Sequence, residues 1–129
     1  MKHSQLAEAL FAAFENGDAD AAKALCAPDL RGSQNGGPSF GLEAVIGFAL
    51  KVKSIAPDFG YKDAVRSDTA TGFVEEHRIC ATLPDGTAFD MMICVVGEVK
   101  GGKVVALREY LDTAAAEPLT RALVKALAG

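Results

Sequence analysis

The sequence has 129 residues, of which 50% are hydrophobic and 23% are charged, and its net charge is −4. This balance is typical of a folded globular domain and excludes a disordered chain. Its lysines and arginines form no cluster, which argues against nucleic-acid binding. The longest apolar run, around residues 91–97, is far shorter than the ~20 residues of a membrane-spanning helix. We therefore expect a single domain, residues 1–129, with neither nucleic acid nor membrane as partner.

The cysteines and histidines suggest no metal and no redox chemistry. Cys26, Cys80 and Cys94 lack CxxC spacing, so we expect reduced, inert thiols in a cytoplasmic protein. The two histidines, His3 and His77, occur in no metal-binding motif. No glycine-rich segment links a strand to a helix as in nucleotide-binding folds. We expect no metal site and no cofactor.

Helical spacing dominates the first half of the chain. Apolar residues recur at intervals of three and four over residues 4–15, which predicts a first helix. A second helix is expected over 19–26 and a third over 42–55, each ending near a proline that follows. Residues 29–38 are crowded with turn-forming residues, and we expect an irregular segment there.

The second half of the chain is predicted to form strands. Segments 59–66, 71–83, 88–99 and 104–111 are rich in β-branched and apolar residues and are separated by turn signals. A last helix is expected over 115–127. The expected fold class is therefore α+β, with N-terminal helices packed on an antiparallel sheet and a C-terminal helix.

The first hairpin determines which side chains share a face of that sheet. If Asp85-Gly86 forms a two-residue loop, Arg78 lies opposite Ile93, and Cys80 lies opposite Met91. Both faces of the sheet then carry mainly apolar residues. The helices can cover one face, and a second subunit is the simplest cover for the other. We therefore expect a homodimer that forms through the face of the sheet.

The same register brings three charged residues together. With a three-residue loop at residues 100–102, Glu109 lies level with Arg78, and Glu76 lies two residues along the same face. The carboxylates and the guanidinium would then lie in apolar surroundings, made by Cys80, Met91, Ile93, Val95, Leu107 and Leu111.

Two interpretations of this cluster remain open. It is either a buried ion-pair network or a site for acid–base chemistry, because charges in apolar surroundings must pair or change their protonation. In the second case Glu109 is the candidate general base, Arg78 orients it or binds an anionic oxygen, and Glu76 positions Arg78 or shuttles a proton. His77 falls on the opposite face, where an interface or exposed position is expected.

Several short motifs resemble the SnoaL-like branch of the NTF2-like superfamily, and their order and spacing follow the family over nearly the whole chain. The resemblance implies a cone-shaped α+β barrel whose curved sheet encloses a deep apolar pocket. It also implies that dimers pack sheet against sheet. The motifs are Phe14-Glu15-Asn16-Gly17-Asp18, Ala27-Pro28-Asp29-Leu30, Gly41-x-x-Ala44-Val45, Leu83-Pro84-Asp85-Gly86, Gly102-Lys103-Val104 and Leu107-Arg108-Glu109-Tyr110-Leu111-Asp112.

Residues 75–112 are most similar to the limonene-1,2-epoxide hydrolase type of member. The resemblance implies that Glu76 occupies the position of that type's arginine. Arg78 and Glu109 occupy the positions of its two catalytic aspartates. Its water-binding tyrosine and asparagine fall near residues 31–35, where Ser33, Gln34 and Asn35 are rough substitutes.

From the residues and the resemblance together, we expect a protein that binds a small hydrophobic molecule. It could be a cofactor-independent acid–base enzyme, that is, an isomerase, cyclase, dehydratase or hydrolase. The alternative is a non-catalytic module for binding a lipophilic ligand or for dimerisation.

Overall fold

The computed structural model describes residues 1–128 and contains four helices and six strands. The helices are α1 (His3–Glu15), α2 (Ala19–Leu25), α3 (Leu42–Ile55) and α4 (Thr113–Ala128). The strands are β1 (Cys26–Gln34), β2 (Phe40–Gly41), β3 (Gly60–Asp68), β4 (Gly72–Thr82), β5 (Ala88–Lys100) and β6 (Lys103–Leu111). None of the helices in these residues is long and apolar enough to cross a membrane.

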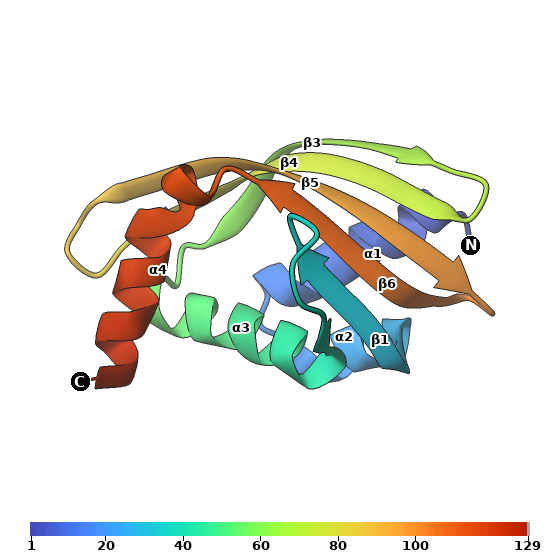
Figure 1. Cartoon of the computed structure of the whole chain (residues 1–129), viewed down its shortest axis with the longest axis horizontal. Helices are drawn as coiled ribbons and strands as arrows, with labels where there is room; N and C mark the ends of the chain where they lie inside the picture. The colour runs from blue at the N-terminus through green and yellow to red at the C-terminus, as the bar shows by residue number, and fades with distance from the viewer. Residues whose placement is uncertain (129) are drawn as a thin grey trace.

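The strands form one open, curved sheet in the order β2-β1-β6-β5-β4-β3 (Figure 1). Helices α1 and α3 lie along its concave side, and α4 packs at one end against α3 and β5. Irregularities in the ladders, between Lys62 and Val65 and between Glu98 and Val99, accompany this curvature, because bulges bend a strand. The sheet thus has an inner face toward the helices and an outer face without cover from them.

The helices form where the sequence predicts them. Leu6, Leu10 and Phe14 of α1 are buried at helical spacing. Asp18 caps α2, because its carboxylate accepts a hydrogen bond from the Ala21 amide at 3.0 Å. Helix α3 has the expected bounds and ends two residues before Pro57.

Two expectations about the sheet need correction. The segment 29–38, expected to be irregular, is largely strand β1, because this segment lies between β2 and β6 and gains its order from pairing with them and not from its own residues. In addition, β1 runs parallel to β6, so the sheet is mixed and not wholly antiparallel. The α+β class with helices on a curved sheet is confirmed.

The predicted register of the first hairpin was wrong by one residue. Thr82 pairs with Ala88, and the loop contains Pro84, Asp85 and Gly86. The Gly86 amide donates to the Leu83 carbonyl at 2.8 Å, and Gly86 alone among the loop residues has a positive φ, of 89°. Pro84 cannot take a positive φ, so it opens an ordinary turn that Gly86 completes, and the loop is one residue longer than expected.

Candidate functional site

The shift in register exchanges the charged residues between the faces of β4. Glu75 and His77 lie on the inner face with exposed fractions of 0% and 1%, whereas Glu76 is exposed on the outer face. Arg78 is also on the outer face, where it pairs with Asp90. The predicted register of the second hairpin was also wrong, because its loop is Gly101-Gly102 and Glu109 lies opposite Val95 and not Ile93. That change is two residues, so Glu109 still faces the helices. The structure therefore does not bring Glu76 and Arg78 together with Glu109.

The residues predicted to surround the ligand divide in a similar way. Met91 is buried on the inner face but belongs to the part of the core next to α4. Leu111 packs against both parts of the core, and Cys80 lies on the outer face beside Arg78 and Asp90. The three that line a cavity are Ile93, Val95 and Leu107.

This cavity has a volume of about 420 Å³ and lies between the inner face of the sheet and helices α1 and α3. Its wall is mainly aromatic and aliphatic. Phe48 of α3 lines the cavity and is 49% exposed, and Gln34 at the end of β1 lines it and is exposed as well. The mouth of the cavity therefore lies beside α3 and the end of β1. The aromatic residues of the wall are Phe11, Phe14, Phe40, Phe48, Phe59 and Tyr61.

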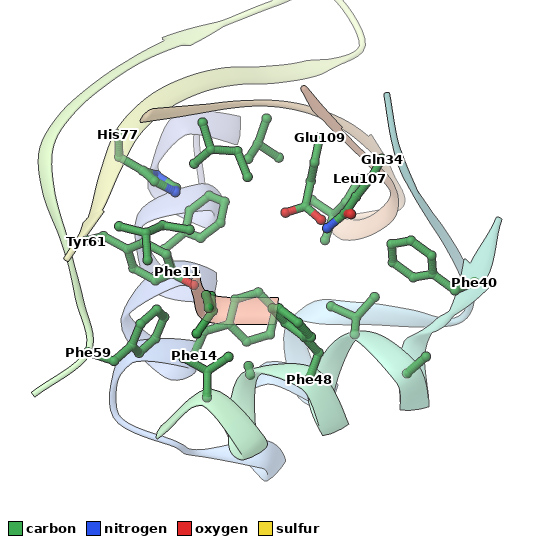
Figure 2. Close-up of a pocket in the computed structure, with 18 residues that line it drawn as sticks. Phe11, Phe14, Gln34, Phe40, Phe48, Phe59, Tyr61, His77, Leu107 and Glu109 are labelled. Atoms are coloured by element: carbon green, nitrogen blue, oxygen red, sulfur yellow. The ribbon is translucent and has the colours of Figure 1, made fainter. Parts of the chain in front are cut away.

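Four polar side chains project into the cavity from four strands of the sheet, β1, β3, β4 and β6. Figure 2 shows His77 and Tyr61 on one side and Glu109 with Gln34 on the other. Along β5, His77 pairs with Ile93 and Glu109 pairs with Val95. Their backbones are thus two strands apart, or ~10 Å, with an offset of two residues, or ~7 Å. A small molecule between them could contact both.

His77 is held by a buried ionic network behind the cavity wall. Its Nδ1 lies 2.6 Å from Oε2 of Glu75, and Oε1 of Glu75 accepts from Nε of Arg66 at 2.6 Å. Glu75 therefore has a partner for each carboxylate oxygen, as a buried charge requires. Because Nδ1 is engaged, Nε2 is the ring nitrogen of His77 that remains for a molecule in the cavity.

Aromatic contacts fix the ring of His77 from the sides. Its centroid lies 4.8 Å from that of Phe11 and 4.4 Å from that of Tyr61. Burial, together with the nearby Glu109, Glu15 and Glu75, raises the pKa of Tyr61 well above its usual value, so the phenol is neutral at physiological pH. The neutral phenol is a hydrogen-bond donor at the same end of the cavity as the imidazole.

Glu109 occupies the opposite end. Burial raises the pKa of its carboxyl group above the ordinary value, and a hydrogen bond from Gln34 and the attraction of His77 partly oppose that shift. A carboxylate with a raised pKa is a stronger base than one in water. Glu109 can thus take a proton from a molecule in the cavity.

Sequence reasoning identified Glu109 but missed Glu75, His77 and Tyr61 as members of the site. The signal for the first two was present, because Glu75 and His77 alternate with Glu76 and Arg78 on one strand. Choosing between the two faces required the register of the hairpin. Tyr61 gave no comparable signal, because it reaches the cavity from the more distant strand β3.

Comparisons with known proteins agree with this architecture. The SnoaL-like domain family matches residues 7–107, so the chain belongs to the SnoaL-like family. No curated protein matches the sequence.

Solved structures share the fold over nearly their full lengths. IdmH from Streptomyces antibioticus, a candidate polyketide cyclase, has a TM-score of 0.81 and 19% identity, with coverage of 92% of this chain and 97% of its own. An LEH-like epoxide hydrolase from M. tuberculosis has a TM-score of 0.73 and 19% identity, with coverage of 98% and 95%. Bal32a, from a soil-derived mobile gene cassette, has a TM-score of 0.78 and 22% identity, with coverage of 90% and 94%. The expected NTF2-like fold is confirmed.

Proposed function

We propose that the protein is an acid–base enzyme that binds a small, largely apolar molecule in the cavity and transfers protons at its two polar ends. The observation that supports this most strongly is the pair of ionisable groups, Glu109 and His77, facing one apolar space from opposite sides. The family membership and the cyclase-like and hydrolase-like neighbours are consistent with such chemistry.

In this proposal Glu109 is the general base. Its carboxylate takes a proton from the bound molecule, since burial makes it more basic than a carboxylate in water. His77 delivers a proton to the oxygen where negative charge develops. Glu75 holds the imidazole by Nδ1 and so fixes its orientation, as a carboxylate does for the histidine of a catalytic triad. Tyr61 adds a neutral donor beside His77.

A reporter substrate can test the base without knowledge of the natural substrate. 5-Nitrobenzisoxazole is a small planar ring whose acidic C–H is removed by a base. The N–O bond then breaks, the C–H electron pair forms a nitrile, and the oxygen leaves as the coloured phenolate of 2-cyano-4-nitrophenol. We expect the wild-type protein to accelerate this reaction, and Glu109→Gln to reduce the rate at least ~100-fold.

Glu76→Gln is the matched control, because Glu76 lies two strands from Glu109 on the exposed outer face. It should keep the wild-type rate. Equal rates for wild type and Glu109→Gln would contradict the proposal. That result, with a ring still bound in the cavity, would support the alternative of a non-catalytic module for a lipophilic ligand.

We also propose that the chain forms a homodimer through the outer face of the sheet and works in the cytoplasm. Val65, Met92 and Tyr110 on that face are 60%, 49% and 44% exposed, and neighbouring Cys94 carries a free thiol. Sedimentation should give a dimer for the wild type and a monomer for the double variant Met92→Lys, Tyr110→Lys. A wild-type monomer at micromolar concentration would contradict the dimer.

A further inference from the structure

In the turn after β1, the side chain of Asn35 makes hydrogen bonds to β6 that the backbone of a strand residue would otherwise make. Asn35 has a φ of 52°, which lies in the left-handed region that asparagine adopts more readily than most residues. Its side-chain Nδ2 donates to the Leu111 carbonyl at 3.0 Å, and its Oδ1 accepts from the Leu111 amide at 3.0 Å. The amide group of Asn35 thus takes both hydrogen bonds that a peptide group would take from β6.

These contacts extend the parallel pairing of β1 and β6 beyond its last residue. The pairing ends with Gln34 opposite Glu109. The Asn35 amide then donates to the Glu109 carbonyl at 2.8 Å. Asn35 therefore binds β6 at residue 109 through its backbone and at residue 111 through its side chain, on either side of the exposed Tyr110.

The segment that Asn35 fixes against β6 includes residues at one end of the candidate site. Gln34 directly precedes Asn35, and its side chain hydrogen-bonds the Glu109 carboxyl group inside the mouth of the cavity. Asn35 itself is exposed and does not line the cavity. It can therefore act on Gln34 and Glu109 only by fixing the backbone to which they belong.

We propose that Asn35 is a positioning residue whose side-chain amide fixes the end of β1 against β6 and so holds Gln34 and Glu109 in place within the cavity. This inference rests on the proposed function only for its effect on catalysis. Without the amide, the end of β1 separates from β6, and the Glu109 side chain turns toward the solvent at the mouth.

Asn35→Gly tests this directly, because glycine keeps the left-handed turn and removes only the amide group. We expect the kcat for 5-nitrobenzisoxazole to fall about 10-fold with little change in KM, since the ring still fits the cavity. Asn35→Asp keeps the acceptor for the Leu111 amide but loses the donor, so its loss should be intermediate. Asn16→Ala, at the other asparagine of the chain and at the C-cap of α1, is the control.

A second measurement separates positioning from stability and needs no substrate. The carboxyl carbon of Glu109 is followed by NMR through a pH titration, with His77 on β4 and Tyr61 on β3 as the titratable groups that face it. In Asn35→Gly the Glu109 pKa should move down toward the ordinary glutamate value, because exposure to solvent removes the burial that raises it, and this outweighs the loss of the hydrogen bond from Gln34, which lowers it. Asn16→Ala should leave the pKa in place. Since the lost hydrogen bonds are exposed, the Tm should stay within about 5 °C of the wild-type value.

An unchanged Glu109 titration in Asn35→Gly would overturn the inference, whatever happens to the rate. An altered titration with no turnover by the wild-type protein would instead support the positioning role and contradict the proposed catalysis. The two failures are thus distinguishable.

Discussion

The two faces of strand β4 carry charged residues in alternation, and their surroundings give these residues opposite properties. On the outer face Arg78 pairs with Asp90 at the surface, where water already solvates both groups. On the inner face Glu75 and His77 are fully enclosed and depend on each other and on Arg66. An exposed ion pair adds little to stability, whereas a buried charge is costly if its partner is removed.

The largest effect on stability is expected at the buried carboxylate. Glu75→Gln removes the buried carboxylate that binds both Arg66 and His77 and leaves Arg66 only the exposed Glu8, at 3.6 Å, so we expect a loss of about 3 kcal/mol in the free energy of unfolding. Urea denaturation followed by circular dichroism measures this loss. Glu76→Gln, one residue along on the outer face, should change the free energy by less than about 0.5 kcal/mol. Equal stabilities of the two variants would remove the proposed difference between the faces.

A smaller, pH-dependent effect is expected at Glu109. Its pKa is raised above the ordinary value of 4.5 in the folded state, so the folded protein keeps a proton that the unfolded chain loses first. The contribution of Glu109 to the wild-type stability should therefore fall as pH rises from 4.5 through the raised pKa. The fall should approach about 1.4 kcal/mol for each pH unit that separates the folded from the unfolded pKa.

Glu109→Gln does not titrate and should lack this part of the fall. Denaturation of both proteins at about pH 4 and about pH 8 isolates the contribution, because every other titrating group is shared. The stability of the variant relative to the wild type should increase with pH. A relative stability independent of pH would show that the pKa of Glu109 is not raised.

The smallest effect is expected at the outer ion pair. The hydrogen bond and charge of Arg78 lower the pKa of Asp90, so the pair stabilises the folded state at neutral pH and is lost as pH falls through that lowered pKa. Asp90→Asn should cost far less stability than Glu75→Gln, and 1 M NaCl should reduce even that cost. A loss at Asp90 equal to that at Glu75, and insensitive to salt, would place the pair in the interior instead.

Most of the fold could be predicted from the sequence because its elements carry strong local signals. Helix α3 follows from apolar spacing and a terminal proline, and strand β6 from its alternation, which correctly turned Glu109 inward. Strand β1 carries no such signal, because Pro28, Asp29, Gly32 and Ser33 are weak strand formers. The strand takes its order from pairing with β2 and β6.

The candidate site was harder to predict because it depends on which face of the sheet each side chain occupies. Pro84 lengthens the first loop by one residue, and a slip of one residue moves every side chain of a strand to the other face. That slip exchanges Glu76 and Arg78 for Glu75 and His77. Asn35, whose amide pairs with Leu111 across 76 positions of sequence, is beyond any local pattern.

The central claim is that the inner cavity between His77 and Glu109 is the functional site. A crystal structure of the wild-type protein with 2-cyano-4-nitrophenol, the product of the reporter reaction, tests it most directly. We predict electron density for the ring in the cavity, with its polar groups toward His77 and Glu109. Density for the ring only on the outer face, beside Arg78, would contradict this account.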